Sequence, residues 1–154
     1  MKRSSCLALQ LIVFLHVALH AQDKAEQKFK NCRHAEKLVT KSWNDDAMLL
    51  ASARDYMTHC SAEMAATGRA RLLLRMGSAL IHMRQFSESV PILEECVDVA
   101  AKNDLRGDFT SCLVDLGTAA ANQGQCDLAQ IHFKAALGIG TTDNLTSVNH
   151  DLAK

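Results

Sequence analysis

The sequence predicts an all-α fold, an α-solenoid of stacked antiparallel helix pairs. The first observation is an internal repeat, because residues 73–80 (LLRMGSAL) recur 40 positions later as residues 113–120 (LVDLGTAA). Units of this length stack so that each one buries the apolar face of its neighbour. The second observation is composition. One Trp, one Tyr and one Pro are too few strand and turn formers for a sandwich or barrel, whereas abundant Ala, Leu, Lys, Glu and Gln favours helix.

Residues 1–21 are predicted to be a cleaved signal peptide. Lys2 and Arg3 precede an apolar run from Leu7 to Ala21, which ends in a small residue. A basic start, an apolar run and a small residue at its end are typical of secretory signals. The run of about 15 residues is shorter than the ~20 needed to span a bilayer, so we expect cleavage after Ala21 rather than an uncleaved anchor. The segment resembles Gram-negative export signals, which would place the mature chain in the periplasm or outside the cell.

The charge balance argues against nucleic acid as the partner. Removing residues 1–21 from 154 leaves 133 residues, enough for one domain. It also leaves 15 basic residues against 17 acidic ones, a net charge of −2. A near-neutral chain of mixed signs lacks the basic footprint of a nucleic-acid binder.

Residues 22–66 are predicted to form a degenerate N-terminal helix pair. Apolar residues three or four apart from Phe29 to Val39 share one helix face. Residues 44–46 (NDD) then offer caps for a second helix. The dipeptide at 67–68 (TG) is either a turn or a weak point inside a longer helix that leads into the repeat.

Residues 67–102 and 103–140 are predicted to be two repeat copies of two helices each, with the first internal turn around residues 84–86. A mid-helix Gly costs about 1 kcal/mol relative to Ala, so we expect close helix packing at Gly77 and Gly117. Facing residues that are small would allow this approach. Four residues are assigned to this packing: Gly77, Ser89, Gly117 and Ala129.

Residues 141–154 are predicted to be either a capping helix or the start of a further repeat. Residues 141–144 (TTDN) are typical of a helix cap, and a helix would then open at Leu145. Ten residues are short for a stable helix. Both alternatives therefore stay open.

The two copies resemble tetratricopeptide repeats. The first copy matches at Leu73, Gly77, Leu80, Phe86, Ser89, Leu93 and Cys96, and the second at Leu113, Leu116, Gly117, Ala120, Gly124, Ala129, Phe133 and Ala136. They cover residues 69–140, and the longer linker around residues 102–104 is similar to that of bacterial periplasmic sensory modules. The family's proline between repeats is absent. The resemblance implies a right-handed solenoid.

The resemblance also implies that a partner peptide or protein lies in a concave groove lined by the first helix of each pair. Carried over by spacing from the two glycines, the groove positions are Arg71, Leu74, Ser78, Ile81, His82, Ser111, Val114, Thr118, Ala121 and Asn122. The clamp that some members use for a C-terminal carboxylate needs Lys and Asn where this chain has Leu74 and Ser78, so that ligand is not expected. The alternative for the apolar positions is contact with neighbouring helices.

Five cysteines remain after cleavage: Cys32, Cys60, Cys96, Cys112 and Cys126. Disulfides are allowed in an exported protein, and an odd count leaves at least one thiol unpaired. Their spacing fits no zinc pattern. Most lie on apolar helix faces, where Cys acts as a small hydrophobe, so we interpret them as core residues. If a bridge forms, Cys96–Cys112 is the best candidate, since consecutive helices meet there.

No motif of a hydrolase, metalloprotease or phosphate-binding loop is present, and we expect no catalysis, cofactor or metal. The sequence therefore predicts an exported adaptor or scaffold that binds protein. One alternative is the periplasmic sensory front end of a histidine kinase or helix-turn-helix regulator, suggested by the helix that would begin at Leu145. A third is a metal- or redox-active helical bundle that uses the cysteines.

Overall fold

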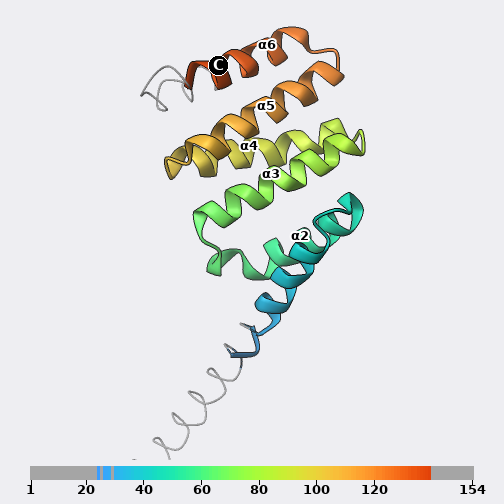
Figure 1. Ribbon diagram of the computed structural model, residues 1–154, viewed down its shortest axis with the longest axis vertical. Helices are drawn as coiled ribbons and strands as arrows, with labels where there is room; N and C mark the ends of the chain where they lie inside the picture. The colour runs from blue at the N-terminus through green and yellow to red at the C-terminus, as the bar shows by residue number, and fades with distance from the viewer. Residues whose placement is uncertain (1–23, 25, 29, 140–154) are drawn as a thin grey trace, which may run out of the picture.

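The computed structural model describes residues 24, 26–28 and 30–139, and that part of the chain is helical with no strand. The predicted all-α class is confirmed. Residues 24, 26–28 and 30–41 are helical and form the first helix. The elements that follow are α2 (Asp46–Cys60), the 3₁₀ turn η1 (Ser61–Glu63), α3 (Ala66–His82), α4 (Phe86–Lys102), α5 (Arg106–Asn122) and α6 (Cys126–Ile139). From α2 to α6 the helices lie beside one another in chain order (Figure 1).

Two predicted segments, the signal peptide at 1–21 and the last segment at 141–154, lie outside the described residues. Among the helices that are described, none combines the length and apolarity needed to cross a bilayer. Residues 67–68 fall in the first turn of α3, so they start a helix and do not form a separate turn. The second N-terminal helix is capped as expected, because the Asp45 side chain accepts a hydrogen bond from the Met48 amide at 3.0 Å.

The helices from α3 onward are joined by three turns of the same design. Each turn holds one residue with positive φ: Arg84 (60°), Asp104 (53°) and Gly124 (76°), spaced 20 residues apart. The amide that follows reaches back five residues, as from Gln85 to the Leu80 carbonyl oxygen at 2.8 Å. This is the Schellman pattern, which satisfies the last carbonyls of a helix and reverses the chain. The following helix then begins at once, so the helices pack antiparallel.

Two buried clusters share α3. One joins α3 to α4, α5 and α6 and includes Leu73, Leu93 and Phe109, whereas the other joins α3 to α2 and includes Leu49 and Leu80. All five side chains are at most 2% exposed. Burying a side chain of this size contributes about 1.5–3 kcal/mol. Helix α3 therefore packs both against the N-terminal helix pair and against the other helices of the repeat.

Gly77 and Gly117 make room for large side chains, which differs from the prediction. A Cβ atom at Gly117 would lie 2.6 Å from Cε1 of Phe133, and one at Gly77 would overlap the Leu93 side chain. The small partners expected to face them are buried, but they are not the nearest neighbours: Ser89 and Ala129. Each glycine is thus a notch in a first helix, filled by a Leu or Phe of the second.

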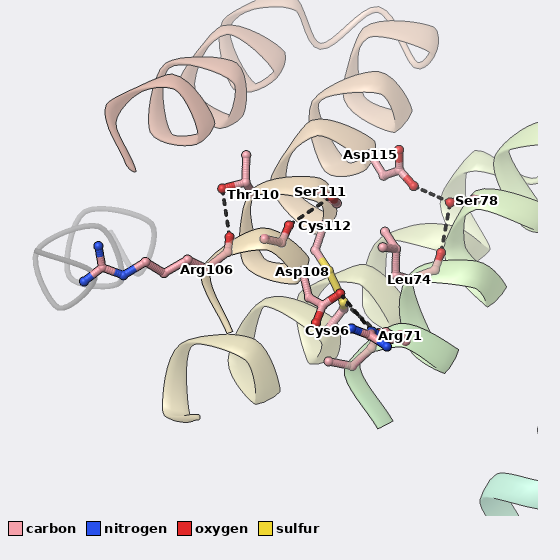
Figure 2. The surroundings of a disulfide bond; sticks show 12 residues. Arg71, Leu74, Ser78, Cys96, Arg106, Asp108, Thr110, Ser111, Cys112 and Asp115 are labelled. Carbon is pink, nitrogen blue, oxygen red and sulfur yellow. Dashed lines mark hydrogen bonds and ion pairs between the residues drawn. A yellow bond between two sulfur atoms is a disulfide. The ribbon is translucent and has the colours of Figure 1, made fainter. Parts of the chain in front are cut away.

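Two disulfides tie helices together. Cys96 of α4 is bonded to Cys112 of α5 with Cα atoms 6.1 Å apart, which agrees with the predicted pair (Figure 2). Cys32 of the first helix is bonded to Cys60 of α2, with Cα atoms 5.6 Å apart. The four sulfurs are buried as expected, but they are paired rather than isolated core thiols. Cys126 is free and exposed.

Candidate functional site

The helices α3 and α5, each the first of its pair, pack beside one another and are joined by polar contacts. The Ser78 hydroxyl oxygen lies 2.5 Å from Oδ2 of Asp115, and Nε of Arg71 lies 3.8 Å from Oδ1 of Asp108 (Figure 2). Residues seven apart lie two turns apart on one side of a helix. Both contacts therefore lie along the boundary between the two helices. We call the surface at this boundary the α3/α5 face. It consists of Arg71, Ser78, Asp108 and Asp115 and the exposed residues beside them.

Asp115 is the electrostatically unusual residue of this face. Burial raises the pKa of Asp115 above its ordinary value of 3.8, while the hydrogen bond from Ser78 and the charge of His82 act in the opposite direction. Ser78 has one hydroxyl proton, and the Leu74 carbonyl oxygen at 3.0 Å is the more distant acceptor. The proton therefore goes to the carboxylate, where a charge-assisted hydrogen bond is stronger.

Residues of the N-terminal helix pair contact the side of α3 that also carries Arg71 and Ser78. Nδ1 of His82 lies 3.1 Å from Oδ2 of Asp46 at the start of α2. The Arg75 guanidinium lies over the Trp43 ring at 4.6 Å and donates from Nη2 to the Trp43 carbonyl oxygen at 2.7 Å. Stacking of this kind contributes about 0.5–1 kcal/mol at exposed sites. The indole is held in place while remaining 41% exposed.

A pocket of about 410 Å³ opens beside Trp43, between the first helix and the start of α3. Its apolar lining comes from Val39, Trp43, Tyr56, Met64, Ala65 and Leu72, and its polar lining from Glu36, Thr40, Thr67 and Arg71. Arg71 also belongs to the α3/α5 face, so the pocket and the face are continuous. A larger hollow of about 680 Å³ lies around Cys32 and Cys60 and includes no predicted site residue.

The structure divides the ten predicted groove residues into two groups. Six are exposed: Arg71, His82, Ser111, Val114, Ala121 and Asn122. Four are partly buried: Leu74, Ser78, Ile81 and Thr118. Leu74 and Ile81 pack against the core cluster of α3 to α6, so these two positions follow the alternative of contact between helices. Val114, at 41% exposed, is a large apolar side chain left open on the face.

Sequence reasoning missed three contributors, Trp43, Asp108 and Asp115. The groove positions are carried over from Gly77 and Gly117 by fixed offsets in sequence, and none of these offsets corresponds to Asp108 or Asp115. The spacing could have identified them, since Asp108 and Asp115 are seven apart, as are Arg71 and Ser78. Trp43 lies in the turn before α2, and the positions 40 and 80 residues later hold Met83 and Gln123, so the repeat gives no signal for an aromatic residue there.

The side chains of the face and the pocket offer hydrogen-bonding groups and exposed apolar surface. The face and pocket supply a guanidinium, carboxylates, hydroxyls and open apolar surface, which suit hydrogen bonding and burial of a partner's side chains. Within the described residues, no three His, Cys, Asp or Glu side chains converge as a metal site would require. Comparison of the chain with protein-family models, with curated proteins and with solved structures found no match.

Proposed function

We propose that this chain is an exported helical-repeat protein that binds a peptide or protein segment without catalysis. The segment lies along the α3/α5 face, from the pocket beside Trp43 to Val114. In this proposal the first helices form the concave wall of a right-handed solenoid of the tetratricopeptide type. The observation that carries it is the pocket beside Trp43, which shares Arg71 with the polar contacts between α3 and α5, together with the exposed Val114 on α5.

Arg71 is the group best placed to recognise a carboxylate of the partner. Its side chain is 73% exposed, and its contact with Asp108 is long, at 3.8 Å. The Asp108 side chain is 20% exposed. A long ion pair whose arginine is exposed contributes about 1 kcal/mol or less, so Arg71 can exchange Asp108 for a carboxylate of the partner at small cost. The pocket beside Arg71 accepts an apolar side chain. We therefore expect an amphipathic or extended segment that combines an apolar residue with an acidic one.

Export is supported by two features. The predicted signal peptide directs the chain out of the cytoplasm. The disulfides Cys32–Cys60 and Cys96–Cys112 are typical of proteins in oxidising compartments.

A library of random peptides displayed on phage, selected against the oxidised protein, tests the binding activity. Calorimetry then gives the Kd of a selected peptide for three proteins: the wild type, Val114→Glu on the face, and Ile131→Glu on α6. The second variant is a matched control, because Ile131 is 50% exposed and Val114 is 41% exposed. We expect Val114→Glu to weaken binding at least about tenfold, or about 1.4 kcal/mol, and Ile131→Glu to leave the Kd unchanged.

Circular dichroism first establishes that both variants melt as the wild type does. Equal loss of binding in the two variants, or full binding by Val114→Glu, would place the site elsewhere. A selection that yields no peptide would contradict the proposed function itself.

A further inference from the structure

His132 is a buried titratable residue in a position where the repeat otherwise has a hydrocarbon. It lies in α6, is 9% exposed, and its Nδ1 atom is shielded from solvent without a hydrogen-bond partner. At the 40-residue offset its counterpart in α4 is Ile92, which packs against both core clusters. An aliphatic residue would suit this packing at any pH, whereas an imidazole suits it only while neutral.

Among the described residues, few charged side chains could compensate a positive charge on the ring. Glu94 of α4 attracts the imidazolium, but burial has the larger effect and lowers the pKa of His132 below its ordinary value of 6.5. On α6 itself, Asp127 and Lys134 are exposed. The other charged side chains of α4 and α5 contact different partners: Glu88 with Arg54, Glu95 with Arg69, Asp98 with Lys102, Arg106 with Asp104, Asp108 with Arg71, and Asp115 with Ser78.

The docking of α6 depends on modest burial. Besides His132, the buried side chains described on α6 are the small Ala129 and Ala136, and Phe133 fills the notch at Gly117. Three large apolar side chains of α6 remain exposed: Leu128, Ile131 and Leu137. A cost of one or two kcal/mol is a large fraction of the stability of a helix that buries so few large side chains.

We propose that the contact of α6 with α5 is an acid-sensitive joint, in which protonation of His132 undocks α6 while α3, α4 and α5 stay packed. A protonated ring would carry an Nδ1–H donor without an acceptor, together with a buried charge, and both disfavour the docked state. Because the docked ring binds its proton less readily than a free ring, docking is fully stable above about pH 6.5 and weakens as the pH falls below that value. This inference goes beyond the proposed binding function.

Amide hydrogen exchange read by mass spectrometry tests the joint in the full, oxidised chain. Exchange is measured at pH 7.5 and pH 5.0 and corrected for the intrinsic pH dependence of the chemistry. In the wild type we expect the opening equilibrium of α6 peptides to increase about tenfold at pH 5.0, while peptides of α3 and α4 keep their protection. His132→Ile, which copies Ile92, should abolish this increase. His82→Gln, at an exposed histidine of α3, should retain it.

Protection of α6 that does not change with pH, or an increase that persists in His132→Ile, would overturn the proposal. An equal loss over all helices would also overturn it, since the joint is local. Should His132→Ile fail to fold, nuclear magnetic resonance titration of the wild-type imidazoles decides. A midpoint for His132 at or above the ordinary histidine value of about 6.5 would contradict the proposal, and a lower midpoint would support it.

Discussion

At the scale of single residues, the close packing of Leu93 against Gly77 gives a testable prediction about stability. A Cβ at Gly77 would overlap Leu93, and one at Gly107 in α5 would meet nothing within 4 Å. Gly77→Ala should therefore destabilise the protein by about 1–3 kcal/mol through overpacking, although Ala is the better helix former. Gly107→Ala, the matched control, should be neutral or stabilising by up to about 1 kcal/mol. Urea unfolding measures both. Equal stability of the two variants would show that Leu93 moves aside freely.

Asp115 gives a prediction with a defined pH dependence. Because burial raises its pKa above 3.8, the stability that its protonated form supplies is present below pH 3.8 and is lost as the pH rises through the higher native pKa. The ionised group therefore costs stability at neutral pH. Asp115→Asn keeps an acceptor for Ser78, so it should be more stable than the wild type at pH 7 and equal to it near pH 3. Chemical unfolding at the two pH values checks this. An Asn variant that is less stable than the wild type at pH 7 would show that the interactions of Asp115 with Ser78 and His82 outweigh the cost of burying its charge.

The sequence located part of the candidate site at residue level. The family resemblance, carried over by spacing from Gly77, predicts Arg71 and Ser78 as groove residues. The structure shows that both contact α5, at Asp108 and Asp115, and their role in binding stays a prediction. The same spacing could not separate Leu74 and Ile81, which pack inward, from the open Val114. Apolar side chains on one helix differ in exposure only through the packing of other helices, which periodicity within that helix does not contain.

At the scale of elements, the turns give the next prediction. Arg84 adopts a φ of 60°, a left-handed conformation that costs a residue with a side chain roughly 1–2 kcal/mol. Glycine avoids that cost but loses more entropy on folding, so Arg84→Gly should stabilise the protein by about 0.5–1 kcal/mol. The reciprocal change, Gly124→Ala, should destabilise it by a similar amount. Thermal unfolding measures both, and stabilisation by Gly124→Ala would contradict the Schellman assignment.

The helix pairs were predictable from the 40-residue offset, but the shorter turn period was not. The three left-handed positions are 20 residues apart and hold Arg84, Asp104 and Gly124. Only one of them is the glycine that normally marks such a turn. The hydrogen bonds of the turn are made by backbone atoms, so side chains of different kinds can occupy it without leaving a common sequence pattern.

At the scale of the whole molecule, the Cys32–Cys60 disulfide is expected to stabilise the N-terminal helix pair against unfolding. Cys32 and Cys60 are 28 residues apart, and cross-linking a loop of that length contributes about 3–4 kcal/mol by limiting the unfolded chain. Replacing both by Ser should lower the free energy of unfolding by about that amount. Replacing the free, exposed Cys126 by Ser should change little. A double variant as stable as the wild type would show that helix packing alone closes the pair.

Binding along the α3/α5 face is the central claim, and Trp43 offers its most direct measurement. It is the sole tryptophan of the chain, it lines the pocket where the partner segment is proposed to begin, and it is partly exposed. Fluorescence is therefore recorded while a selected peptide without tryptophan is titrated into the oxidised protein. The account predicts a saturable change in Trp43 emission that gives the calorimetric Kd. Calorimetric binding with unchanged Trp43 emission would contradict it.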